Sequence, residues 1–286
     1  KETFDSLIIM SSINQATYKF VLFDKLKVLI LLCFSGMVVY FSTVHSPFLY
    51  DDAHAIQDNP YIKDLSEFQQ TVGIQNIFNR SVLLLTFSIN HALGQANVFG
   101  FHLINITLHI CVGIVFYFLA IELLILEQPS IRPTLRKLPL IASLIHLFNP
   151  VAVESVTYIS SRSSVLATLF YLLSFYFLVR FNKEKQNQKI KPSYFCFPLL
   201  AVLLFFLGLG TKEIIVTLPV MAVFYFWARS PEKIFRKFLP ELTVILLPLI
   251  GYLLYRYAEM GDLLVLKTDP YSHLVDRGLY LLTQIK

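Results

Sequence analysis

The chain has 286 residues, of which 56% are hydrophobic and 15% are charged, and its 24 Lys and Arg exceed its 19 Asp and Glu to give a formal charge of +5. Soluble domains usually carry about 25% charged residues, whereas the mean hydropathy here is +0.62, so most side chains must face lipid or one another. This composition argues against a soluble enzyme, a secreted disulfide scaffold, a disordered chain and a nucleic-acid-binding protein. It predicts an all-α, polytopic transmembrane helical bundle.

The chain divides into a short N-terminal segment and one long membrane domain. We expect residues 1–25 to be cytoplasmic or interfacial and residues 26–286 to form a transmembrane domain that is incomplete at its C-terminus. A half-apolar stretch, 81–93, is interrupted by Asn90 and His91 and is expected to lie at the membrane interface. The simplest prediction is seven membrane crossings, one for each apolar run. These runs lie near 26–45, 98–126, 138–148, 163–179, 194–210, 214–227 and 239–255.

The positive charges predict the orientation, because cytoplasmic loops retain Lys and Arg. An N-terminus inside places most of the 24 basic residues in the cytoplasm. Run 138–148 is short: as a helix it would rise only about 16 Å, against a hydrocarbon core of about 30 Å. We therefore expect the polar segments 149–162 and 211–213 to lie below the outer headgroups, in a mouth lined by protein.

Two adjacent acids, Asp51 and Asp52, follow the first crossing. They would hydrate the loop or cap the next helix in an ordinary membrane protein. They would also suit a reaction in which a hydroxyl group loses its proton, since one carboxylate can act as the base while the other orients it. The sequence alone supports these two interpretations of Asp51 and Asp52 equally.

A second group follows Pro150, which should end the preceding crossing or start a short helix. On such a helix Glu154, Tyr158 and Arg162 are spaced four apart and would share one face. A structural ion pair or a snorkelling arginine would explain them. A functional role for these three residues is favoured over the structural explanations, because ionisable groups are costly inside a membrane.

The third group is the tight connection Gly208–Glu213, which carries the pair Lys212 and Glu213 between two apolar runs. Lys212 could bind a lipid phosphate, or it could pair with Glu213 in a solvated turn. Arg80 could likewise bind phosphate, or it could anchor the chain at the membrane interface. On the second crossing, His102, Asn105 and His109 share a face, where interhelical hydrogen bonding is favoured over a metal site.

Taken together, these segments resemble the membrane half of the O-mannosyltransferase family that joins a GT-C glycosyltransferase module to tetratricopeptide repeats, with its bacterial relatives. The resemblance covers roughly residues 26–286. It is carried by Tyr50-Asp51-Asp52, Asn79-Arg80, Phe101-His102-Leu103-Ile104-Asn105, Asn149-Pro150, Glu154-Ser155-Val156, Ser161-Arg162, Lys212-Glu213 and Thr217-Leu218-Pro219. It implies an all-helical GT-C fold that transfers a sugar, typically mannose, from a polyprenyl-phosphate donor to protein Ser or Thr outside the cytoplasm.

From the residues and the resemblance we expect an inverting glycosyltransferase in which Asp52, or its neighbour Asp51, takes the proton from the acceptor. The leaving lipid phosphate would be met by the cations Arg162, Lys212 and Arg80, and supported by Glu154, Glu213 and Tyr158. No metal is required, although a divalent ion at Asp51 and Asp52 is compatible with the pattern.

The expected partners are a polyprenyl-phosphate sugar, an acceptor protein and membrane lipid. The expected location is the bacterial inner membrane, with the N-terminus in the cytoplasm and the site facing the periplasm. The alternative is a non-catalytic scaffold or anchor subunit that keeps the same fold within a larger assembly.

Overall fold

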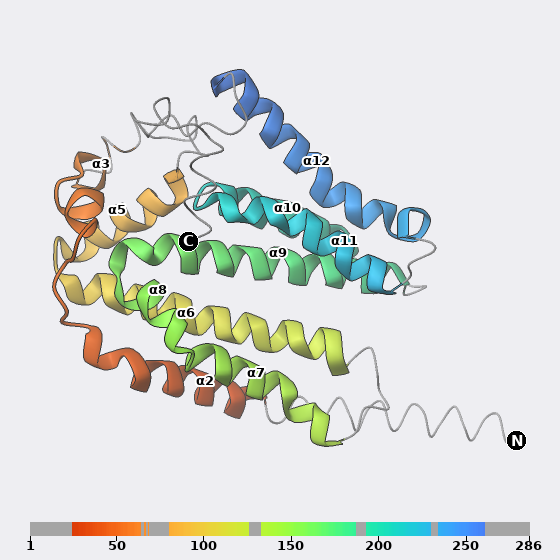
Figure 1. Cartoon of the computed structure of the whole chain (residues 1–286), viewed down its shortest axis with the longest axis horizontal. Coiled ribbons are helices and arrows are strands. Elements are labelled where there is room, and N and C mark those ends of the chain that lie inside the picture. Colours follow the sequence, from red (N-terminus) through yellow and green to blue (C-terminus); the bar gives the residue numbers. More distant parts are fainter. Residues whose placement is uncertain are drawn as a thin grey trace, which may run out of the picture. The chain divides into compact units, whose positions relative to one another are not determined.

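A computed structural model (Figure 1) describes residues 25–63, 66, 68, 80–125, 133–186, 193–229 and 234–260. Every secondary-structure element in these residues is helical, which confirms the predicted all-α bundle. The expected N-terminal segment lies almost entirely outside the described residues, as do Asn79 and everything after residue 260. The domain boundary at residue 25 therefore stays a prediction.

In the described residues a helix occurs at each of the seven apolar runs, and three further helices, α3 (Pro60–Lys63), α5 (Val82–Gly94) and α8 (Val153–Thr157), lie between them. The helices at the runs are α2 (Lys25–Tyr40), α6 (Val98–Ala120), α7 (Leu138–Leu147), α9 (Arg162–Gln186), α10 (Ser193–Leu209), α11 (Leu218–Arg229) and α12 (Ile234–Met260). Short 3₁₀ or π turns connect several of them, namely η2 (Ala53–Gln57), η5 (Ile121–Ile125), η7 (Pro150–Ala152), η8 (Ile159–Ser161) and η9 (Glu213–Thr217).

Fewer helices than predicted are long enough to cross a membrane unaided. In the described part of the chain, four helical stretches pass by length and apolarity, in α2, α6, α9 and α12. The count is five if α7 and the 150–157 segment, bent by 47°, form one broken span. α10 and α11 have only 17 and 12 residues, and 12 residues rise about 18 Å. The chain is a multi-pass membrane protein, and the position of its polar segments below the outer headgroups stays a prediction.

The chain separates into two compact units, residues 1–218 and 219–286. In the first unit α6 packs against α2, α7, α8 and α9, and α9 packs against α10 (Figure 1). Gly113 permits one of these contacts, since a Cβ there would lie 3.0 Å from Leu147 of α7. In the second unit the rings of Phe226 and Phe238 stack with their centroids 4.7 Å apart.

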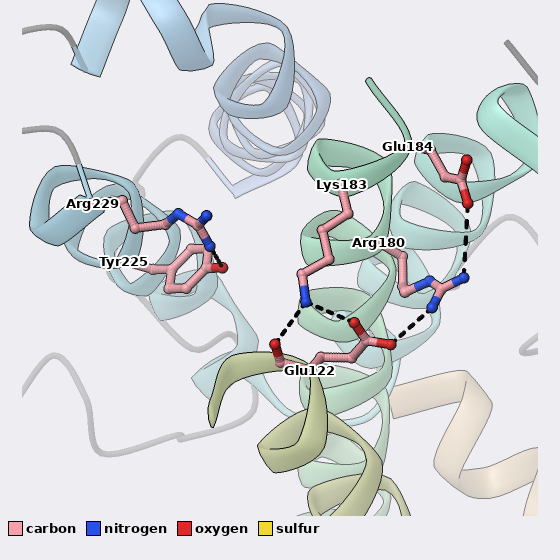
Figure 2. Close-up of polar contacts among 6 residues, drawn as sticks. All are labelled: Glu122, Arg180, Lys183, Glu184, Tyr225 and Arg229. Atoms are coloured by element: carbon pink, nitrogen blue, oxygen red, sulfur yellow. Dashed lines mark hydrogen bonds and ion pairs between the residues drawn. The ribbon is translucent and has the colours of Figure 1, made fainter. Parts of the chain in front are cut away.

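An ion-pair cluster joins the end of α6 to the last turns of α9 (Figure 2). The buried carboxylate of Glu122, in η5, accepts hydrogen bonds from Arg180 and Lys183, each at 2.8 Å. Lys183 Nζ also donates to the carbonyl oxygen of Glu122 at 2.6 Å. Arg180 lies 18 residues after Arg162, so this cluster is about 27 Å along α9 from the start of that helix.

Candidate functional site

A cavity of about 380 Å³ lies where the first turns of α5 and α9 meet η2 and the turn that precedes η9. The apolar part of its wall is formed by Ala55, Leu83, Leu84 and Phe87. Its polar lining is formed by Asp51, Arg80, Tyr158, Ser160, Ser161, Ser163, Ser164 and Lys212. The three segments singled out in the sequence, which are more than 160 positions apart at their extremes, therefore meet at one cavity.

The two neighbouring acids have different environments. Asp51 is exposed and lines the cavity. Asp52 is only 1% exposed, and its carboxylate accepts hydrogen bonds from the backbone N–H of Leu49 at 3.1 Å and of Ser160 at 2.8 Å. The Ser160 hydroxyl donates to it as well. Asp52 thus ties the 49–52 segment to η8, and among the described residues that line the cavity Asp51 is the only one with a carboxylate.

Tyr158 reinforces this link between the two segments. Its hydroxyl oxygen accepts a hydrogen bond from the backbone N–H of Asp51 at 2.9 Å, and its ring meets that of Tyr50 edge-on at 6.4 Å. Desolvation raises the pKa of the Tyr158 phenol, and the charges of Asp51 and Asp52 raise it further. The phenol therefore stays neutral at physiological pH and can donate a hydrogen bond.

The expected common helical face of Glu154, Tyr158 and Arg162 is wrong. α8 ends at Thr157, Tyr158 has an extended backbone with φ −83° and ψ 114°, and α9 starts afresh at Arg162. Glu154 stays exposed in the first turn of α8 and does not line the cavity. The break at Tyr158 turns its phenol toward Asp51 and away from the Glu154 helix face.

Arg162 lies behind the cavity wall and does not line it. Its side chain is fully buried, and its guanidinium lies 4.4 Å from the ring centroid of Phe87, which does line the cavity. All five N–H groups have acceptors, which come from α5 and α6: Asn105 Oδ1 at 2.7 Å, Thr86 O at 3.3 Å, Thr86 Oγ1 at 3.4 Å, Asn90 Oδ1 at 2.9 Å and Phe101 O at 3.1 Å. Since a guanidinium has five donors, none remains for a ligand.

Lys212 reaches the cavity from the turn between α10 and η9. Its Nζ donates to Ser164 Oγ at 2.8 Å and does not pair with Glu213, which begins η9 and does not line the cavity. The turn is tight at Gly208, where a Cβ would collide with Ile215. It is joined to the start of α5 by a hydrogen bond from Val82 N to the carbonyl oxygen of Gly210 at 3.0 Å.

Arg80 supplies the second cation of the cavity. It is exposed and holds a left-handed backbone, with φ 58°, immediately before α5. The lining thus carries two cations and one carboxylate, and α5 and α9 begin beside it. Because the N-terminus of a helix attracts negative charge, this cavity favours an anionic ligand.

The structure also adds residues that sequence reasoning missed. Ser163 and Ser164 line the cavity together with Ser160 and Ser161, and Thr86 and Asn90 hold Arg162. The serines on both sides of Arg162 were a visible signal, and so was Asn90, which interrupts the apolar stretch 81–93, whereas nothing local marked Thr86.

The predicted face of α6 serves hydrogen bonding. His102 Nε2 lies 3.0 Å from the carbonyl oxygen of Ser46, and Asn105 Nδ2 donates to Val156 and Ile159. Hydrogen bonding is thus confirmed for His102 and Asn105. His109 packs against Tyr40 and His146, and the described residues hold no group of three His, Cys, Asp or Glu that could bind a metal.

The helices and the cavity define a helical membrane protein with a cationic, serine-rich cavity at the ends of two helices. Among known proteins, the chain is 26% identical over 205 residues to protein O-mannosyl-transferase F38B6.6 of Caenorhabditis elegans, which is 68% of this chain and 28% of that relative. It is 30% identical over 153 residues to human protein O-mannosyl-transferase TMTC2, covering 49% of this chain and 17% of the relative. Human protein O-mannosyl-transferase TMTC1 is 25% identical over 206 residues, covering 68% of this chain and 22% of the relative.

These homologues confirm the resemblance drawn from the motifs: the curated relatives of this chain are protein O-mannosyl-transferases of the TMTC kind. The chain spans less than a third of the length of each of the three relatives described. No family model matches the chain, and no solved structure matches it.

Proposed function

We propose that this protein is a glycosyltransferase whose active site is this cavity. It transfers a sugar, mannose in the first instance, from a polyprenyl-phosphate donor to a Ser or Thr hydroxyl of an acceptor protein on the extracytoplasmic side. One observation carries the proposal: in the described part of the chain, the carboxylate of Asp51 and the cations Arg80 and Lys212 line the same cavity. A glycosyl transfer needs this combination, because a proton leaves the acceptor while negative charge develops on the leaving phosphate. The homologues, which are named as protein O-mannosyl-transferases, support the same activity.

In this mechanism Asp51 is the base. Its carboxylate takes the proton of the acceptor hydroxyl as the oxygen attacks the anomeric carbon of the sugar, and the bond from that carbon to the phosphate oxygen breaks. The electron pair stays on the lipid phosphate, whose charge Lys212 and Arg80 stabilise. Attack opposite the leaving group inverts the anomeric carbon. Because the two side-chain cations neutralise the phosphate, the step does not require a metal.

Three of the remaining predicted residues, Asp52, Tyr158 and Arg162, support the site without contacting the substrates in this proposal. Asp52 holds η8 against the 49–52 segment, and Tyr158 fixes the backbone of Asp51. The buried charge of Arg162 raises the positive potential of the cavity through Phe87 without touching the ligand. Glu154 and Glu213 do not line the cavity, so in this proposal neither contacts the substrates.

The two acids provide the decisive experiment. Asp51→Asn keeps the shape of the side chain and removes its basicity, so kcat for transfer from polyprenyl-phosphate mannose to a pool of Ser- and Thr-containing peptides should fall about 10²- to 10⁴-fold. The melting temperature should stay near that of the parent protein, because the Asp51 side chain is exposed. Asp52→Asn should instead lower the melting temperature, since it disturbs a buried acceptor of three hydrogen bonds.

Glu154→Gln is the matched control, because Glu154 is an exposed carboxylate outside the cavity. Its activity and stability should equal those of the parent protein. Full activity of Asp51→Asn would overturn the proposed base. A folded parent protein that shows no transfer with any polyprenyl-phosphate sugar would favour the scaffold alternative.

A further inference from the structure

Tyr50 is held in an unusual position beside the cavity. It is 87% exposed, so almost none of its ring is buried. Its backbone is left-handed, with φ 46°, a conformation that bulky residues rarely adopt. An aromatic residue is therefore kept at a cost in backbone energy without the gain of burying its ring.

Hydrogen bonds on both sides of Tyr50 enforce this conformation. Asp52 N donates to the carbonyl oxygen of Leu49 at 2.9 Å, and the Asp52 carboxylate accepts from Leu49 N at 3.1 Å. On the other side, Asp51 N donates to the hydroxyl of Tyr158 at 2.9 Å. The ring of Tyr50 meets the ring of Tyr158 edge-on, at 85°. The same contacts that position Asp51 thus present the ring of Tyr50 at the rim.

The order of groups in the proposed transfer indicates what this ring would touch. An in-line displacement places the phosphate, the sugar, the acceptor oxygen and the base in that sequence. In the proposed transfer the phosphate would lie at Lys212 and Arg80 and the acceptor hydroxyl at Asp51, and all three residues line the cavity. Tyr50 directly precedes Asp51, and its ring meets that of Tyr158, which lines the cavity, so the ring lies next to the residue proposed as the base.

We infer that Tyr50 is an acceptor-binding residue, whose ring packs against the polypeptide that carries the reacting Ser or Thr. This inference rests on the proposed function, in which Asp51 is the base. Tyrosine suits the role because it offers a large, rigid and amphipathic surface at a low cost in conformational entropy. An extended acceptor segment that places its hydroxyl at Asp51 would cover the exposed ring with its neighbouring residues.

The test measures peptide binding and turnover separately. In Tyr50→Leu, the dissociation constant of a Ser- and Thr-containing peptide pool and the KM for that acceptor should rise roughly five- to thirtyfold, as for the loss of an aromatic interface residue. The kcat at saturating acceptor and the affinity for polyprenyl-phosphate mannose should be unchanged. Tyr50→Phe should bind the peptides like the parent protein, because the ring and not the hydroxyl makes the contact.

A matched control separates this role from membrane anchoring, for which exposed tyrosines are also used. Tyr257 on α12 is 59% exposed and does not line the cavity, so Tyr257→Leu removes an exposed ring and leaves the lining unchanged. It should leave the peptide affinity unchanged. Peptide affinity that is unaltered in Tyr50→Leu, or a parent protein that binds no peptide, would overturn the inference.

The two proposals also fail in different ways. If Asp51→Asn is fully active, the proposed base is wrong whatever Tyr50 does. If transfer depends on Asp51 while Tyr50→Leu keeps the parental acceptor KM, only the acceptor role of Tyr50 is wrong. A weaker affinity of Tyr50→Leu for the donor, with an unchanged affinity for peptides, would place the ring on the sugar and also overturn the inference.

Discussion

The guanidinium of Arg162 should be the most sensitive point of the first compact unit. Arg162→Met keeps an extended side chain but removes five hydrogen bonds and leaves buried acceptors on Thr86, Asn90, Phe101 and Asn105 without a donor. Each unsatisfied buried group costs about 1–3 kcal/mol. Removing the buried charge offsets part of that cost, because an ion also costs energy to bury.

We therefore expect Arg162→Met to lower the free energy of unfolding by about 4 kcal/mol. For a unit of this size, a melting temperature falls by about 2–4 °C per kcal/mol, so the shift should be roughly 8–16 °C. Thermal unfolding in detergent, followed by circular dichroism, measures it. Arg162→Lys should lose less than Arg162→Met, since an ammonium group with three donors can serve some of the acceptors.

Arg256→Met is a suitable comparison, because the guanidinium of Arg256 bonds Tyr252 one turn earlier in its own helix. That substitution should cost no more than about 1 kcal/mol. If Arg162→Met melts within 2 °C of the parent protein, as a ~1 kcal/mol change would allow, the five hydrogen bonds do not stabilise the bundle in the way described.

Two further predictions concern sidedness and the donor. A cysteine placed at Lys185 should react only with reagents that reach the cytoplasm, whereas one placed at Gln57 should also react with impermeant reagents added outside. The opposite labelling would reverse the orientation predicted from the basic residues. Lys212→Gln should weaken binding of a polyprenyl phosphate roughly tenfold or more, because a charge-assisted bond is worth about 1.5–3 kcal/mol, while binding of a phosphate-free polyprenol should not change. Equal losses for the two lipids would mean that Lys212 supports only the fold.

Much of the bundle could be predicted from the sequence, because long apolar runs identify helices almost independently of tertiary context. The second and fourth runs became α6 and α9 as expected. The count of crossings was less secure, since α10 and α11 are shorter than a membrane is thick and neither their composition nor their spacing reveals how they are accommodated.

The candidate site could be predicted by segment but not by side chain. Asp51 and Asp52 are adjacent, so no pattern shows which of them faces a cavity and which is held by Ser160, a residue 108 positions away. The break at Tyr158 was likewise hidden, because a four-residue spacing suits a continuous helix as well as it suits an interrupted one. Arg162 was recognised as important, but its acceptors come from helices 57–76 positions earlier in the chain.

The ion pairs of Glu122 have a mechanical consequence for the cavity at the other end of α9. That helix is fixed to α6 at two points about 27 Å apart, by Arg162 through Asn105 and by Arg180 and Lys183 through Glu122. Sliding α9 by one helical turn, about 5.4 Å, would break both attachments at once, whereas one attachment alone would leave the helix free to pivot. The position of Ser163 and Ser164 along the axis of α9, relative to Asp51, is thus set partly by the ion pairs of Glu122 at the other end of that helix.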